Sequence, residues 1–166
     1  MNKQKYQNSL AKRFVEGYPE NIVKNTETAT LLKFNFKFLD VNQKNVGFCD
    51  FDDLKAGELQ MLFEKIKAFS TKSRCDWEKT PTGCSGHPLL VVYGNIPKNS
   101  KAVHPKHVPC DIEWARFRLE GSFRLVGFFI PDSLDKASYR ANGRDYLFDR
   151  NTFYVVFIDP KHNFYP

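Results

Sequence analysis

Apolar and polar residues alternate along the last third of the chain, and this pattern predicts a β-sheet. In the segment 113–119 one face is apolar, while the opposite face carries Arg116 and Arg118. A period of two is typical of a strand. The turn residues 120–122 include a glycine that tolerates positive φ, and they lead into a returning strand at 123–130. We therefore expect an antiparallel pair.

Further strands complete the predicted sheet. The segment 153–158 is apolar on both faces, so we expect it to be central and covered on both sides. The segment 31–39 alternates between apolar residues and Lys or Asn, which indicates a half-buried strand. An apolar run at 89–93 is a candidate for a short additional strand. The sequence thus predicts an antiparallel sheet of about four to five strands.

One main helix is expected beside this sheet, at residues 52–71. Its apolar residues recur at spacings of three and four and form a single stripe. The stripe comprises Leu59, Leu62, Phe63, Ile66 and Phe69. Asp50 or Asp52 is placed to cap the first amides. Packing of this stripe on one face of the sheet gives a two-layer α+β fold, in which residues 1–166 form a single domain.

Three other segments lack a clear pattern. Residues 1–30 are polar and basic, and they form either a frayed terminus or an arm that contacts phosphates. Prolines and glycines interrupt residues 72–111, which are expected to be mostly irregular, as is the polar excursion 131–152. Long irregular connections in a small domain are often functional.

Composition limits the class of protein. Hydrophobic residues make up 42% of the 166 residues and aromatic ones 15%, which is enough to form a core. No apolar run approaches the roughly 20 residues that cross a bilayer, and the basic N-terminus lacks the apolar region of a secretory signal. We therefore expect a cytoplasmic protein with reduced cysteines and no membrane partner. Nucleotide-binding glycine motifs, HExxH and nucleophile elbows are absent, which argues against the enzymes that carry them.

The positive charge of the chain favours an anionic partner. The formal net charge is +6 and the pI is about 9.1, so nucleic acid or an acidic protein is attracted. The guanidinium group suits phosphate because its planar fork donates two parallel hydrogen bonds. The arginines predicted to contact nucleic acid are Arg116, Arg118, Arg140 and Arg144.

Catalytic residues are predicted near the ends of the strands. Arg124 begins the returning strand, and Lys161, His162 and Tyr165 directly follow the last one. If the strands are adjacent, these groups meet and can cleave RNA without a metal. One group takes the proton from the ribose 2′-hydroxyl, cations stabilise the phosphorane, and an acid protonates the leaving oxygen. The alternative is that the arginines face solvent and the tail merely packs.

The C-terminal part of the chain resembles the C-terminal sheet of the RelE/ParE toxin superfamily. The resemblance lies in the segments WARFRLEGSFRLVGF and FYVVFIDPKHNFY. In that superfamily a basic strand, a short turn, a second strand opening with Arg-Leu and an apolar third strand precede a basic and aromatic tail. The resemblance implies a RelE-like fold and ribosome-dependent cleavage of mRNA, with the ribosome and an antitoxin protein as partners and no cofactor. By position, Arg116, Arg118 and Arg124 are similar to the strand arginines, and Tyr165 to the terminal tyrosine.

The chain also departs from this superfamily, and the resemblance covers less than half of it. Members are usually shorter, so the segments 72–111 and 131–152 are additional here. Other members inhibit gyrase instead, and the fold therefore does not fix the target. The tail DPKHNFYP is also similar to that of small bacterial proteins without an assigned activity.

A zinc site is the other chemical candidate. Cys84-x-x-His87 and His107-x-x-Cys110 are spaced like two halves of a tetrahedral site. Zinc would stabilise the irregular region 72–111. Such pairs also arise by chance in loops with several histidines, and a metal is not favoured.

Three functions follow from these alternatives. The first, which we favour, is a RelE-like, metal-free mRNA endoribonuclease. The second is a non-catalytic basic module that binds RNA or protein. The third is an interaction protein stabilised by zinc.

Overall fold

The computed structural model of the protein describes residues 27–83 and 86–166. Almost all of the basic segment 1–30 therefore lies outside the described residues. The elements are β1 (Lys33–Asn35), α2 (Ala56–Phe69), α3 (Arg74–Lys79), β2 (Leu90–Gly94), β3 (Glu113–Arg118), β4 (Arg124–Phe129), β5 (Ser138–Ala141), β6 (Arg144–Leu147) and β7 (Thr152–Asp159). Short 3-10 helices lie at Glu27–Ala29, Lys44–Val46, Phe51–Asp53 and Asp132–Leu134.

The fold is α+β, with a mixed sheet of five strands in the order β1-β7-β4-β3-β2. Neighbouring strands are antiparallel except that β1 runs parallel to β7. The prediction of a purely antiparallel sheet is therefore wrong at this edge. Most of the chain separates β1 from β7, which leaves ample length for a parallel crossover. The alternation of residues 31–39 carries no information about strand direction.

The edge strand β1 is also shorter than the predicted strand 31–39. After Asn35 the chain turns, and the Asn35 side chain accepts a hydrogen bond from the backbone N–H of Lys37. Phe36 then packs in the core on the helix side of the sheet, whereas Phe38 packs in the core on the other side. The alternating pattern therefore marks a segment that crosses from one face of the sheet to the other.

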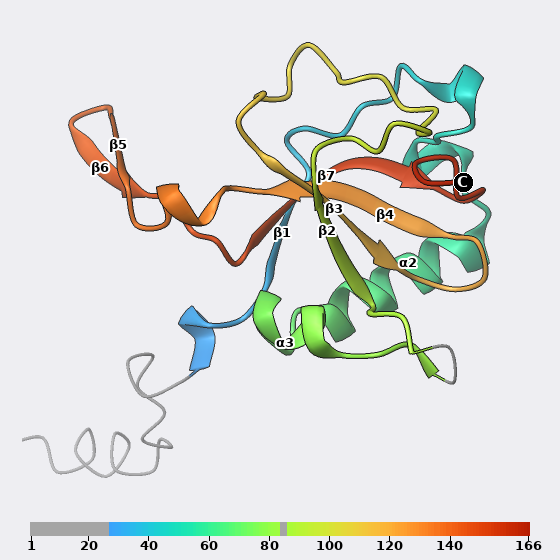
Figure 1. The fold of residues 1–166 in the computed structure, drawn as a ribbon, viewed down its shortest axis with the longest axis horizontal. Helices are drawn as coiled ribbons and strands as arrows, with labels where there is room; N and C mark the ends of the chain where they lie inside the picture. Colours follow the sequence, from blue (N-terminus) through green and yellow to red (C-terminus); the bar gives the residue numbers. More distant parts are fainter. Residues whose placement is uncertain (1–26, 84–85) are drawn as a thin grey trace, which may run out of the picture.

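Helix α2 covers one face of the sheet (Figure 1). Its Leu62 and Phe69 are buried among apolar side chains of β3, β4 and β7. The helix begins four residues later than predicted, because Asp50 caps the short 3-10 helix Phe51–Asp53 instead. Phe63 does not belong to the buried stripe: its side chain is 54% exposed.

The opposite face of the sheet is covered by segments without regular structure, not left open. Phe48, Val108 and Phe164 pack there against Trp114 and Phe157. In Figure 1 these segments form the layer above the sheet, with α2 below it. The two-layer prediction therefore omitted a layer, since loops that bury single large residues show no periodicity.

The segments 72–111 and 131–152 contain more regular structure than predicted. In the first, β2 confirms the candidate strand at 89–93, whereas α3 was not predicted. Trp77 of α3 donates a hydrogen bond from Nε1 to the Phe69 carbonyl. The second includes the hairpin β5–β6, which projects from the body of the protein (Figure 1). Asn142 and Gly143 both have positive φ at its turn, as tight hairpin turns require.

Candidate functional site

The strand register places three arginines next to one another. Arg118 on β3 lies directly opposite Arg124 on β4, which in turn lies opposite Asp159 on β7. Arg116 precedes Arg118 by two residues and points to the same face. These pairings follow from the β3–β4 hairpin, whose turn contains Gly121 with a φ of 52°. Three of the arginines predicted from the sequence thus form one group.

These arginines are poorly solvated and lack carboxylate partners. Arg116 is 7% exposed and Arg124 is 5% exposed. No ion pair joins either of them, or Arg118, to a carboxylate of the described residues. A buried charge without a partner is unfavourable, so this cluster is held in place at the expense of stability.

Unpartnered nitrogen atoms mark the same place. Within residues 27–83 and 86–166, five buried side-chain nitrogens have no hydrogen-bond partner, and one of them is in Arg74. The other four all belong to this cluster: Arg116 Nη1, Arg118 Nε, Arg124 Nε and His162 Nε2. Buried polar atoms are normally satisfied, so four unsatisfied ones in one group indicate a site for a ligand.

Burial and neighbouring positive charges lower the pKa values of Arg124 and His162. Burial, together with the charges of Arg116 and Arg118, lowers the pKa of the Arg124 guanidinium to about 10. Burial and the charges of Arg124 and Arg116 also hold the pKa of His162 below its ordinary value. The imidazole is therefore neutral at neutral pH and can accept a proton. An anion bound here would relieve both effects.

The C-terminal tail is folded back onto the sheet by Asp159. This carboxylate is fully buried and accepts hydrogen bonds from the backbone N–H groups of Lys161, Asn163 and Phe164. Within this turn His162 adopts a left-handed φ of 59°. Such a conformation is uncommon outside glycine and recurs at functional sites. The turn positions the imidazole beside the arginines.

A pocket of about 460 Å³ opens between this tail and strands β2 and β3. Its lining consists of His87, Pro88, Val91, Tyr93, Arg116, Arg118, His162, Tyr165 and Pro166. Arg116 Nε donates a hydrogen bond to the Tyr93 hydroxyl, which fixes the guanidinium. The Tyr93 and Tyr165 rings lie 5.5 Å apart. Cationic groups and tyrosines therefore share one cavity, which we call the arginine pocket.

Not all predicted site residues are there. Lys161, which is exposed, and Arg124, which is buried opposite Arg118, are not among the residues that line the arginine pocket. Arg140 and Arg144 lie on the projecting hairpin, far from the C-terminus in Figure 1. Arg140 Nη1 lies 3.7 Å from Asp145 across that hairpin. The pairing of β5 with β6 directs these two arginines away from the sheet.

Sequence reasoning missed Tyr93 and did not place His87 at this site. Tyr93 reaches the pocket because β2 pairs with β3, with an irregular register between Val92 and Gly94. That pairing has no signature in the sequence. His87, considered above as a zinc ligand, lines the arginine pocket.

The candidate zinc ligands that the structure describes, His87, His107 and Cys110, do not form a metal site. His107 lines a different pocket from His87, and its Nε2 lies 3.1 Å from the Phe38 carbonyl oxygen. Cys110 is exposed, and Cys84 lies outside the described residues. In the part of the chain that the structure describes, no group of three or more His, Cys, Asp or Glu side chains is arranged to hold a metal ion.

Comparison of the chain with protein families, curated proteins and solved structures finds no match. The described residues also include no helix with the length and apolar character needed to cross a bilayer. The functional argument therefore depends on the geometry of the arginine pocket.

Proposed function

We propose that the protein binds RNA at the arginine pocket and cleaves it without a metal. The observation that carries this proposal is the group of four buried, unpartnered nitrogen atoms on Arg116, Arg118, Arg124 and His162. Each of these atoms is oriented by the fold yet has no acceptor among the described residues. A phosphodiester in the arginine pocket supplies anionic acceptor oxygens for the groups that line it, Arg116, Arg118 and His162. Its charge also offsets the positive charge of Arg124, which is buried next to Arg118.

Phosphate suits this pocket better than a carboxylate does. Its oxygens point in several directions, so the guanidinium groups of Arg116 and Arg118 can donate to it at once. Tyr93 and Tyr165 also line the pocket and provide rings against which a base can stack. A ribonucleotide therefore matches both the charge and the shape of the cavity.

The proposed reaction uses residues already at the pocket. Neutral His162 accepts the proton of the ribose 2′-hydroxyl, and the 2′-oxygen attacks phosphorus. The arginines stabilise the negative charge of the phosphorane. The bond to the 5′-oxygen then breaks, and the Tyr165 hydroxyl protonates this leaving group. The products are a 2′,3′-cyclic phosphate and a 5′-hydroxyl. Proton exchange with water restores both side chains.

Incubation of the purified protein with labelled RNA in EDTA tests this proposal. We expect products that end in a cyclic phosphate, and loss of cleavage in His162→Asn. Asparagine is chosen because it tolerates the left-handed backbone of this position. Parallel reactions with and without ribosomes test whether the substrate is ribosome-bound mRNA, as in RelE-like proteins. Absence of cleavage in both reactions by a folded protein would overturn the nuclease proposal.

A non-catalytic RNA-binding module is the second candidate, and one observation favours it. The Asp159 carboxylate is committed to three backbone N–H groups, and no described carboxylate accepts a hydrogen bond from the His162 imidazole. A general base is usually oriented by such a partner. RNA binding by the wild type that depends on Arg118, without any cleavage, would establish this module.

A further inference from the structure

A second pocket lies at the other end of the same sheet face. Its volume is about 430 Å³, which is in the range of small-molecule sites. Phe128 lines it and lies four residues along β4 from Arg124, so about 13 Å of strand separates this pocket from the buried arginine. The lining residues are Asn35, Lys37, Phe38, Pro109, Asp111, Ile112, Phe128, Ile130, Pro131, Leu134, Phe148 and Tyr154.

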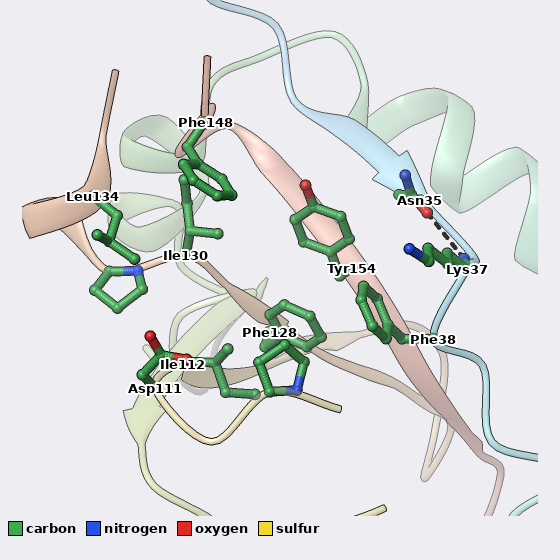
Figure 2. A pocket seen from close by; sticks show the side chains of 12 residues that line it. Asn35, Lys37, Phe38, Asp111, Ile112, Phe128, Ile130, Leu134, Phe148 and Tyr154 are labelled. Carbon is green, nitrogen blue, oxygen red and sulfur yellow. Dashed lines mark hydrogen bonds between the residues drawn. The ribbon is translucent and has the colours of Figure 1, made fainter. Parts of the chain in front are cut away.

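Aromatic rings form one wall of this second pocket. The Phe128 and Tyr154 rings are stacked, with centroids 4.9 Å apart and an angle of 14° between the planes. Phe38 meets both rings edge-on. In Figure 2 this wall faces Ile130, Leu134 and Phe148 across the cavity. A space between an aromatic wall and an apolar wall suits a flat ring.

The rim of this pocket carries polar groups of opposite charge. The Lys37 ammonium lies 5.4 Å from the centre of the Phe38 ring and forms no ion pair with a described carboxylate. Asn35 accepts the Lys37 backbone N–H through Oδ1, so its amide group remains a donor. Asp111 is exposed, lies at the other side of the cavity in Figure 2, and makes no hydrogen bond or ion pair among the described residues.

We propose that this second pocket binds a nucleotide whose base carries an exocyclic amino group, such as cytosine or adenine. The base stacks on the Tyr154–Phe128 wall, and the Asp111 carboxylate accepts a hydrogen bond from the amino group. Lys37 contacts the phosphate. The choice of a nucleotide rests on the proposed RNA function, whereas the stacking wall and its charged rim are independent of it.

Charge complementarity selects this ligand over a purely apolar one. An aliphatic side chain of a peptide would fill the cavity but would leave Lys37 and Asp111 without partners. A nucleotide uses both, because its phosphate is anionic and its base edge donates a hydrogen bond. Uracil carries a carbonyl oxygen at the position of the cytosine amino group, and that oxygen would face the Asp111 carboxylate unfavourably.

Titration of the protein with cytidine and uridine, followed by NMR, tests this inference. These nucleosides lack a phosphate, the group that the arginines of the arginine pocket are proposed to bind. We expect cytidine to bind about tenfold more tightly than uridine, a ratio in the range of one base-edge contact. Tyr154→Leu should weaken cytidine binding about tenfold, because stacking is lost. Asp111→Asn should reduce the discrimination between cytidine and uridine.

Arg118→Gln provides the control that separates this inference from the proposed function. It should leave cytidine binding within about twofold of the wild type while it weakens RNA binding. Equal binding of cytidine and uridine, or cytidine binding that Tyr154→Leu leaves unchanged, would overturn the inference and leave the arginine pocket untouched. Failure of Arg118→Gln to weaken RNA binding would overturn the proposed function but not the base site.

Discussion

Arg118 and Arg124 occupy directly opposite positions on the antiparallel strands β3 and β4. Like charges in this arrangement repel each other, and they destabilise a sheet. A carboxylate offsets this repulsion only in part: Asp159 pairs with Arg124 in the register and attracts it, but forms no ion pair with it and binds backbone amides instead. The sheet therefore retains an unfavourable contact that an anionic ligand would relieve.

Anions are expected to stabilise the wild-type protein through this contact. A ligand that binds only the folded state adds about 2.7 kcal/mol when its concentration is a hundredfold above Kd. We predict that inorganic phosphate and short RNA raise the thermal unfolding midpoint. Arg118→Gln should unfold at the wild-type temperature or higher without ligand, and phosphate should raise its midpoint less than that of the wild type.

Lys67→Gln is the matched control for this experiment. It removes one positive charge from an exposed position on α2, on the other side of the sheet. Its response to phosphate should equal that of the wild type. If both variants lose the same part of the response, only net charge matters, and the pocket is not the binding site.

The low pKa of His162 predicts the pH dependence of cleavage. The imidazole must be neutral to accept a proton, so the rate should rise with pH through a pKa below the ordinary value of about 6.5. Arg118→Gln removes one of the nearby charges that lower this pKa. The rising part of the pH–rate profile should therefore shift to higher pH in this variant. Pre-steady-state cleavage rates at several pH values measure this shift. An unchanged pH–rate profile in Arg118→Gln would show that another group is the base.

The same pKa affects stability, with a definite sign. Because the folded state binds this proton less readily than the unfolded state does, stability is greatest above the unfolded pKa. It decreases as pH falls from about 6.5 towards the lower folded pKa. Urea unfolding of the wild type and His162→Asn over this range should show a shallower pH dependence in the variant. A steeper dependence in His162→Asn would contradict the assignment.

Gly127 is predicted to be essential for the packing of the sheet. A Cβ atom at this position would overlap the Tyr154 carbonyl oxygen and come close to the Phe153 ring. Because backbone cannot move aside as a side chain can, Gly127→Ala should destabilise the fold by about 3 kcal/mol or more. Chemical unfolding measures this loss.

Gly57→Ala is the comparison for Gly127→Ala. A Cβ at Gly57 would meet no atom within 4 Å, and the residue lies in α2, where alanine is favoured. This variant should be as stable as the wild type or more stable by about 0.5 to 1 kcal/mol. Similar losses in both glycine variants would contradict the register between β4 and β7.

Asp159 is predicted to position the tail. Replacement by Asn keeps the size of the side chain but removes an anionic oxygen that accepts a backbone N–H. Asp159→Asn should lower stability by about 1 to 3 kcal/mol. It should also reduce cleavage more than RNA binding, because His162 loses its fixed place while the arginines remain. Kd and the cleavage rate, measured on the same RNA, separate the two effects. A purely structural role would reduce both in proportion.

The sequence was sufficient to predict the elements whose periodicity is local. The alternation at 113–119, the glycine turn and the apolar segment 153–158 gave the hairpin β3–β4 and the inner strand β7 close to their observed bounds. This hairpin also predicted that Arg118 and Arg124 lie close together, since the two residues flank one short turn. Whether the grouped residues act on RNA remains a prediction.

Non-local features were beyond a single sequence. The parallel pairing of β1 with β7 depends on a contact between segments more than a hundred residues apart. Tyr93 reaches the arginine pocket because of the register in which β2 pairs with β3. A long connection joins these two strands, so no tight turn in the sequence indicates that register. The Asn142-Gly143 hairpin was different: its turn signal is present in the sequence, but no apolar alternation flanks it, because its strands are almost wholly exposed.

The salt dependence of RNA binding tests the central claim most directly. For single-stranded RNA each phosphate contact contributes about 0.7 to the slope of log K against log salt concentration. Arg118→Gln should therefore reduce the slope by about 0.7 and weaken binding about tenfold at moderate salt, whereas Lys67→Gln should change neither. An unchanged slope in Arg118→Gln, or equal effects in the two variants, would contradict the claim that the arginine pocket holds a phosphate.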